Sequence, residues 1–338
     1  MHRRTIALTF CLGLLLLFAS STALAQYQLV KLISNQVGVG LQPPDPLLVN
    51  AWGLVHGPGT PWWISDNGSG WSTLYGPAGQ KQSLQVEIPA ASGRPGSPTG
   101  IVFNGSQDFQ VRGWASIFLF ATLDGTISGW APQVDLHHAI LAVSTPGASY
   151  TGLAISRKPS GNFLFAADNA NNKVDIYDST FKLVSSFTDA TVPAGFSPFG
   201  IRDFGGLVYV AFASFSGATG GFIDIFSEKG EFLKRLIQNG PLNQPWGFAA
   251  APSNFGPLSN TLLISNNTNS GTINGFNAIT GQFVGTVKNT SGNVIHIDQL
   301  WAIDFGDGTA ANGQKNQLFF TAGPNNNAAG LFGKIVFK

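Results

Sequence analysis

Trp52-Gly53-Leu54 is the first of six similar phrases in this 338-residue chain, and the others are Thr99-Gly100-Ile101, Thr151-Gly152-Leu153, Phe199-Gly200-Ile201, Trp246-Gly247-Phe248 and Trp301-Ala302-Ile303. Each phrase has an aromatic residue or Thr, then Gly or Ala, then an aliphatic residue or Phe. The central residues are separated by 47, 52, 48, 47 and 55 residues, taken as differences of residue number. This period suits one four-stranded blade of a β-propeller. The sequence therefore predicts an all-β fold, a six-bladed β-propeller.

Three further strand-like runs follow most of the phrases. Second runs lie at 62–67, 117–122, 163–168 and 262–266, third runs at 125–130, 173–177, 222–226 and 271–276, and fourth runs at 84–88, 139–143, 181–187, 232–237 and 282–287. No fourth run follows the last phrase. Residues 27–33 have the same character and precede the first phrase, so we expect an N-terminal strand that closes the last blade and removes an open sheet edge.

The Gly of each phrase has a structural explanation, because innermost strands crowd around the axis of a propeller and a residue without Cβ allows close approach. The loops that lead into the innermost strand and those that leave the second strand emerge on the same face. The phrases and the polar endings of the second strands are therefore expected at one mouth of the central channel.

The chain start is typical of a secretory signal peptide, with Arg3 and Arg4 in a basic segment, an apolar run at 5–18 and Ala23-Leu24-Ala25 as a cleavage site. We expect residues 1–25 to be removed, a single propeller domain over 26–338, and a secreted or periplasmic protein. The apolar run is short for a membrane span. Cleavage leaves 16 basic and 17 acidic residues, a formal charge of −1, which argues against nucleic acid as a partner.

Several enzyme classes lack their signature residues in this chain. There is no Gly-x-Ser-x-Gly elbow, His-Glu-x-x-His pair, Walker loop, paired Cys motif or complete EF-hand loop. Glu occurs only at positions 87, 228 and 231, so chemistry with two facing carboxylates would depend largely on Asp. No catalytic residue is assigned from the sequence.

Polar residues at the ends of the second strands are the first candidate ligand-binding residues. They are Asp66, Asn67, Asp124, Asp168, Asn169 and Asn266. Hard oxygen ligands arranged around a channel could hold Ca²⁺ or orient a polar ligand. Alternatively, these side chains bond to the backbone of their own turns.

Aromatic and titratable residues near the phrases complete the candidate set. Trp52, Trp246 and Trp301 could stack on a sugar or an aromatic ligand, or could pack between blades. His296 and Asp298 precede Trp301 and form the one His-carboxylate neighbourhood that ring closure suggests. His296 could act as a general base, or could be an ordinary hydrogen-bonding residue.

The chain resembles a family of uncharacterised secreted bacterial propellers related to NHL-repeat proteins. The resemblance rests on phrases such as Asn50-Ala51-Trp52-Gly53-Leu54, Ser65-Asp66-Asn67-Gly68, Pro245-Trp246-Gly247 and Phe320-Thr321-Ala322-Gly323-Pro324-Asn325, and it covers nearly the whole mature chain. It implies a propeller outside the cytoplasm but no substrate. Some members carry a PEP-CTERM tail, which we do not expect after Ile335-Val336-Phe337-Lys338.

Three functional hypotheses follow. The leading one is a module that binds a small ligand or a protein at the channel mouth. The second is a Ca²⁺-assisted hydrolase or lyase similar to gluconolactonase-type propellers, whose Ca²⁺ is held by an early Glu with Asn and Asp; here no Glu precedes Glu87. The third is a structural module that docks other chains.

Overall fold

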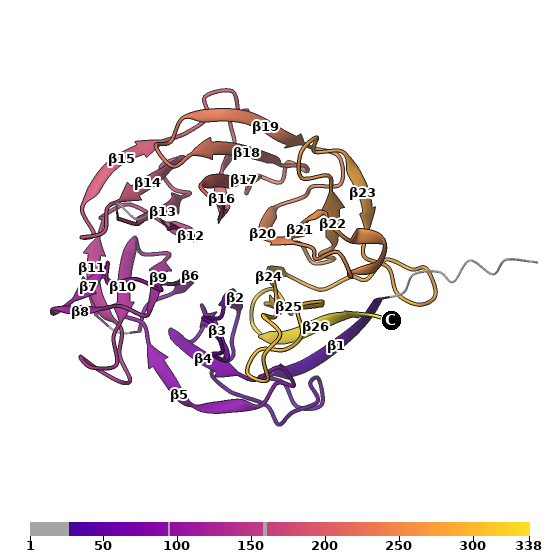
Figure 1. The fold of residues 1–338 in the computed structure, drawn as a ribbon, viewed down its shortest axis with the longest axis horizontal. Coiled ribbons are helices and arrows are strands. Elements are labelled where there is room, and N and C mark those ends of the chain that lie inside the picture. Colours follow the sequence, from indigo (N-terminus) through magenta and orange to yellow (C-terminus); the bar gives the residue numbers. More distant parts are fainter. Residues whose placement is uncertain (1–26, 94, 158–160) are drawn as a thin grey trace, which may run out of the picture.

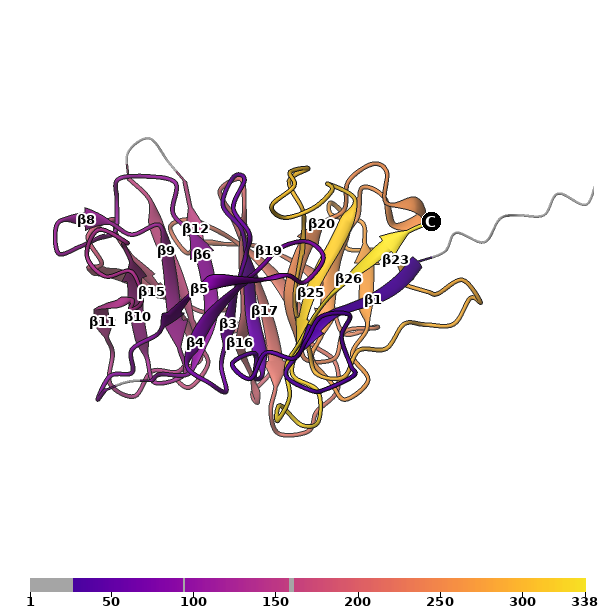
Figure 2. The same cartoon turned by 90° about the horizontal axis from the view of Figure 1, so that it is seen from below.

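The computed structural model describes residues 27–93, 95–157 and 161–338 and has six four-stranded antiparallel sheets arranged in a ring (Figure 1). Seen from the side, the blades form a short cylinder (Figure 2). This arrangement confirms the predicted six-bladed β-propeller. The predicted signal peptide lies outside the described residues. No helix of the described residues is long and apolar enough to span a membrane.

Blades one to five each take four strands in chain order, from the channel outward. Blade one consists of β2 (Ala51–Val55), β3 (Trp62–Asp66), β4 (Trp71–Tyr75) and β5 (Lys81–Glu87). Blade two consists of β6 (Pro98–Phe103), β9 (Phe118–Thr122), β10 (Thr126–Trp130) and β11 (Ile140–Ser144). Blade three consists of β12 (Tyr150–Ser156), β13 (Phe163–Asp168), β14 (Lys173–Tyr177) and β15 (Leu183–Phe187).

The remaining blades complete the ring. Blade four consists of β16 (Phe196–Phe204), β17 (Leu207–Ser214), β18 (Phe222–Ser227) and β19 (Phe232–Gln238). Blade five consists of β20 (Pro245–Ala250), β21 (Leu262–Asn266), β22 (Ile273–Phe276) and β23 (Phe283–Thr286). Blade six consists of β24 (Leu300–Phe305), β25 (Gln317–Ala322), β26 (Leu331–Phe337) and, outermost, β1 (Tyr27–Ser34).

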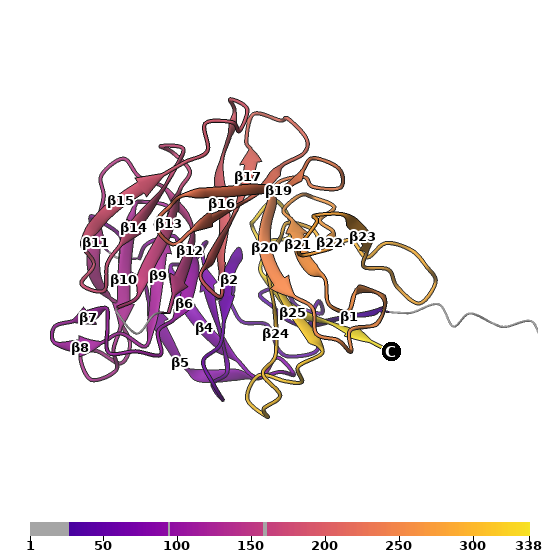
Figure 3. The same ribbon diagram turned by 45° about the horizontal axis from the view of Figure 1, so that its top comes forward.

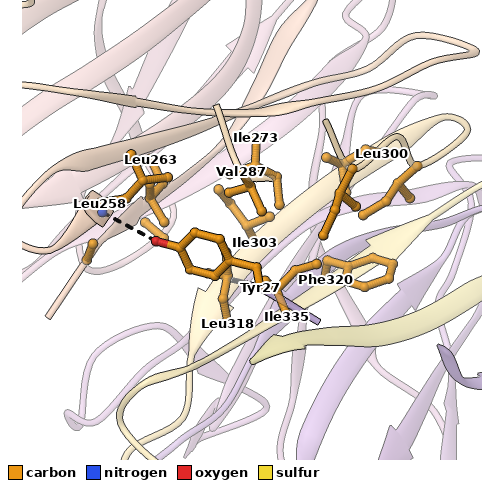
Figure 4. Packing of buried hydrophobic residues seen from close by; sticks show 14 of the residues in the cluster. Tyr27, Leu258, Leu263, Ile273, Val287, Leu300, Ile303, Leu318, Phe320 and Ile335 are labelled. Carbon is orange, nitrogen blue, oxygen red and sulfur yellow. Dashed lines mark hydrogen bonds between the residues drawn. The ribbon is translucent and has the colours of Figure 1, made fainter. Parts of the chain in front are cut away.

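The pairing of β1 with β26 joins the two ends of the described chain. The strands are antiparallel, with Tyr27 opposite Phe337. Tyr27 also packs into the core between blades five and six (Figure 4), where its hydroxyl donates to the Phe255 carbonyl at 2.7 Å and accepts from the Leu258 N–H at 3.3 Å. The predicted N-terminal closing strand is therefore confirmed, and a buried tyrosine anchors it.

Two short elements were not predicted. A hairpin of β7 (Gln110–Val111) and β8 (Trp114–Ala115) is inserted between the first two strands of blade two, and a 3-10 helix, η1 (Gly256–Leu258), lies between β20 and β21. The hairpin turns through Arg112 and Gly113, both with positive φ, as a tight two-residue turn requires. It leaves Trp114 53% exposed.

Figure 3 shows the innermost strands β2, β6, β12, β16, β20 and β24 around the channel. Neighbouring innermost strands approach each other closely at the repeated glycines. A Cβ on Gly53 would lie 2.4 Å from the Thr99 carbonyl oxygen, and one on Gly200 would lie 1.9 Å from that of Trp246. Both distances are shorter than a carbon-oxygen contact allows. The structure thus supports close approach as the reason for Gly in the phrases.

Apolar side chains fill the gaps between neighbouring blades rather than one central core. Between blades one and two, for example, Trp63 stacks on Phe118 with ring centroids 4.2 Å apart and contacts Trp130 at 4.8 Å. Equivalent clusters lie in the other gaps. The blades therefore hold each other in place, and the channel is lined by the innermost strands.

Candidate functional site

Four aromatic side chains close the channel where the innermost strands begin. Trp52 and Trp301 stack, with ring centroids 3.5 Å apart and an interplanar angle of 19°. Trp246 meets both rings edge-on, at 6.1 and 5.7 Å. Trp52 also contacts Phe199 of blade four, across the ring, at 6.2 Å. We call these four residues the aromatic plug and this end of the channel the Trp end.

The plug is part of the core. The exposed fractions of Trp52, Trp246 and Trp301 are 6%, 8% and 3%, and Phe199 is fully buried. The Trp246 indole N–H donates to the Thr151 carbonyl at 3.0 Å, and that of Trp301 donates to Asn50 Oδ1 at 3.2 Å. The indole faces therefore contact other plug residues, as in the packing interpretation of the sequence.

Amides that follow the second strands link neighbouring blades. The side-chain amides of Asn67, Asn169 and Asn267 donate to the carbonyls of Pro98, Pro198 and Leu300 at 3.2, 2.9 and 3.2 Å. Each acceptor directly precedes the first residue of the next phrase. Asn266 accepts a bond from the Asn243 N–H at 3.0 Å and donates to the Pro241 carbonyl at 2.7 Å. These amides stabilise the Trp end of the ring.

The candidate carboxylates also bond within their own blades and loops. Asp66 is fully buried and accepts from the Thr73 hydroxyl at 2.7 Å, and burial raises the pKa of its carboxyl well above the usual range. Asp168 is buried and accepts from the Asn171 side chain at 2.7 Å. Asp124 is exposed and bonds to the Thr122 hydroxyl. The three carboxylates lie in three different turns.

His296 and Asp298 bond to different partners. His296 is exposed, and its Nδ1 lies 2.9 Å from the Ser270 hydroxyl. Asp298 Oδ2 accepts from the Asn325 N–H at 3.0 Å. Among the described residues, no group of three or more His, Cys, Asp or Glu side chains is placed to hold a metal ion. Ca²⁺ binding stays a prediction that elemental analysis of the purified protein would test.

Behind the plug, the channel opens into a cavity of about 390 Å³. Its walls are the innermost strands of the blades, and Trp246 belongs to its lining. The lining includes Gly53, Leu54, Val55, Ile101, Phe103, Leu153, Ile155, Arg157, Ile201, Arg202, Asp203, Phe248 and Ile303. The volume falls within the range of sites for small molecules, and polar and apolar groups contribute about equally to the lining surface.

Charged residues gather where the innermost strands end, which we call the Arg end. Arg157 donates to the Phe103 carbonyl at 3.1 Å and lies over the Phe103 ring, 5.6 Å from its centroid. Arg202 of blade four forms an ion pair with Asp304 of blade six at 2.8 Å, passing the innermost strand of blade five. In the described part of the chain, Arg157 forms no comparable ion pair.

No sequence motif marks the Arg end. Arg157 and Arg202 lie five and two residues after the glycines of their phrases, Gly152 and Gly200. A usable signal was that strands entering the channel at one face must leave it at the other, so residues a few positions after each Gly lie at the opposite mouth. The candidate residues predicted from the sequence were all assigned to the mouth that carries the repeated phrases, the Trp end.

No family model matches the chain. An uncharacterised protein of Acanthamoeba polyphaga mimivirus is 28% identical over 346 residues, covering 94% of this chain and 82% of the viral protein. A second uncharacterised protein of the same virus is 27% identical over 349 residues, covering 94% and 88%. These relatives are viral, whereas the resemblance stated above is to bacterial proteins.

Solved structures share the fold at low identity. A glucose dehydrogenase has a TM-score of 0.59 at 11% identity, covering 91% of this chain and 98% of that one. A streptogramin B lyase has a TM-score of 0.53 at 14% identity, covering 93% and 98%. Virginiamycin B lyase from Staphylococcus aureus, in a structure with quinupristin, has a TM-score of 0.52 at 12% identity, covering 92% and 99%. At these identities the likeness shows the propeller fold alone.

Proposed function

We propose that this protein is a ligand-binding propeller that holds one small molecule in the channel cavity at the Arg end. We further propose that it acts outside the cytoplasm, as the signal-like residues 1–25 suggest. The observation that carries the binding proposal is the cavity itself, about 390 Å³ and bounded on one side by the aromatic plug. Such a blind pocket removes most of a small ligand's surface from water.

The lining indicates the chemistry of the ligand. Leu54, Ile101 and Ile201 offer apolar surface, and burying such surface contributes about 25 cal/mol per Å². Arg202 is already paired with Asp304. Arg157 keeps guanidinium N–H groups beyond the one bonded to Phe103, and a guanidinium binds carboxylate or sulfonate strongly. The expected ligand therefore has an apolar body and one anionic group.

A titration with anilinonaphthalene sulfonate tests this proposal, because the dye has an aromatic body and a sulfonate and becomes fluorescent in apolar sites. We expect saturable binding of one dye per chain. Val55→Trp fills the cavity near the Arg end and should abolish binding, and Arg157→Gln should weaken it about tenfold, the equivalent of one charge-assisted hydrogen bond.

A matched variant separates the cavity from general charge effects. Lys229→Gln removes an exposed cation from a turn of blade four, at a residue that does not line the cavity, and should leave dye binding unchanged. Equal dye binding by the wild-type protein and Val55→Trp, with both folded, would overturn the proposal. No observation favours the Ca²⁺-assisted hydrolase or lyase over this function.

A further inference from the structure

A second pocket lies at the Trp end, on the opposite face from the channel cavity. Its volume is about 340 Å³, and it is lined by loops of blades four and five and by the residue that precedes blade six. Gln244 and Gln299, which line it, each lie two residues before a plug tryptophan and share a left-handed backbone, with φ of 50° at both positions. The two glutamines thus occupy equivalent places in successive repeats.

The side chains of this pocket are polar and uncharged. Besides Gly217 and Ala218, the lining consists of Thr219, Asn243, Gln244, Thr268, Asn269 and Gln299. None of these side chains ionises, so the pocket has no group that would hold an anion or a cation by charge. Four amides together provide both donors and acceptors at one place.

Much of this hydrogen-bonding capacity is unused within the described part of the chain. The Gln299 side-chain N–H donates to Asn269 Oδ1 at 2.6 Å, and that of Gln244 donates to the Ser214 carbonyl at 3.4 Å. The carbonyl oxygens of both glutamine side chains, the Asn269 amide nitrogen and the whole Asn243 side-chain amide have no partner among the described residues. These groups are available to a ligand that donates and accepts at closely spaced positions.

An exposed aromatic residue lies close in the chain to the residues that line the pocket. Phe215 precedes the lining residue Gly217 by two positions and is 58% exposed, one of the most exposed aromatic side chains of the protein. Its ring meets Phe199 of the plug edge-on, with centroids 4.8 Å apart and an interplanar angle of 89°. The ring is therefore held in place while its surface stays in contact with water.

We propose that this pocket binds a neutral sugar. A pyranose presents vicinal hydroxyls, each of which donates and accepts, and these match the unused amide groups of Asn243 and Asn269. It also presents an apolar C–H face, which suits an exposed aromatic ring such as Phe215. This inference concerns residues other than those of the channel cavity and goes beyond the proposed function.

Saturation-transfer NMR with maltotetraose, cellotetraose, chitotetraose and xylotetraose tests the proposal, with sialyllactose as the charged comparison. We expect at least one neutral tetrasaccharide to bind. Asn243→Ala combined with Asn269→Ala should weaken that binding at least about fivefold, and Phe215→Ala should reduce the transfer to sugar C–H protons. The matched control is Asn293→Ala, which removes an exposed amide outside the pocket lining.

Two further variants separate this site from the channel cavity. Val55→Trp and Arg157→Gln should leave sugar binding unchanged, whereas the Asn243 and Asn269 variants should leave dye binding unchanged. The proposal is overturned by absence of binding for all four neutral sugars, or by sugar binding that survives the Asn243→Ala and Asn269→Ala double substitution. Preferential binding of sialyllactose would equally contradict it.

Discussion

Trp52 and Trp301 stack across the junction at which the ring closes, with ring centroids 3.5 Å apart. Trp52 is the second residue of β2, the innermost strand of the first blade, and Trp301 is the second residue of β24, that of the last. The stack therefore stabilises blade closure at the channel, while the pairing of β1 with β26 completes blade six at the rim. The same pair forms half of the plug that makes the channel cavity blind.

Removal of a plug ring should destabilise the fold. Trp301→Ala deletes a 3% exposed indole from the centre of the ring and should lower the free energy of unfolding by about 3–5 kcal/mol. Urea unfolding measures the change. Trp114→Ala removes a 53% exposed indole from the hairpin and should change stability by at most about 0.5 kcal/mol. Similar losses for the two variants would show that the plug has no special role.

A methyl group at a repeated glycine should be tolerated poorly. Gly200→Ala places a Cβ 1.9 Å from the Trp246 carbonyl oxygen. The substitution should lower the free energy of unfolding by about 3 kcal/mol or more, because two innermost strands must separate. Gly285→Ala in β23 is the control, since its Cβ would meet Leu258 at 3.6 Å, an ordinary contact. The free energy of unfolding of that variant should rise by about 0.5 kcal/mol, because Ala has less conformational entropy than Gly in the unfolded chain. Thermal unfolding of both variants tests the difference.

The buried carboxyl of Asp66 should make stability depend on pH. Burial raises its pKa, and so does the nearby Asp45, while Lys81 and the bonds from Thr73 lower it. Since the folded-state pKa exceeds the unfolded one, the folded protein binds the proton more tightly. The contribution of Asp66 to stability is thus full at low pH and is lost as the pH rises through its folded-state pKa.

Asp66→Asn isolates that contribution, because its amide oxygen can still accept from Thr73. Urea unfolding from about pH 5 to about pH 9 should show the wild-type protein losing stability relative to the variant as the pH rises. Parallel curves for the two proteins would mean that Asp66 does not titrate differently in the folded state.

The closing strand should be required for a monomeric ring. Deletion of residues 27–34 exposes the whole edge of β26, and an unpaired strand edge promotes association between chains. We expect oligomers in size-exclusion chromatography. Tyr27→Phe keeps the strand but removes the hydroxyl that bonds to the Phe255 carbonyl and the Leu258 N–H. It should lower the free energy of unfolding by about 1 kcal/mol and leave the protein monomeric. A monomeric deletion variant would contradict this account of closure.

Patterns with a long period predicted most of the fold. The six phrases gave the number of blades, and the apolar alternation at 27–33 gave the closing strand, because both follow from rules that act on every repeat. The β7–β8 hairpin has only two residues in each strand, too few for an alternating pattern. It was therefore not predicted.

The site was less accessible from sequence. Trp52 and Phe199 belong to opposite blades, and their contact depends on the channel diameter, which no local pattern encodes. Whether an indole at the channel binds a ligand or fills the channel is decided by that contact. Arg157 and Arg202 follow ordinary apolar strands without a motif, and the pairing of Arg202 with Asp304 joins residues from two blades that are not neighbours.

The most direct test of the central claim is a crystal structure of the protein grown with anilinonaphthalene sulfonate. The account predicts electron density for the dye in the channel cavity, between Trp246 of the plug and Arg157, with the sulfonate within hydrogen-bond distance of the guanidinium. Density for the dye only on the outer strands or at the Trp end, with the channel cavity holding water, would contradict it.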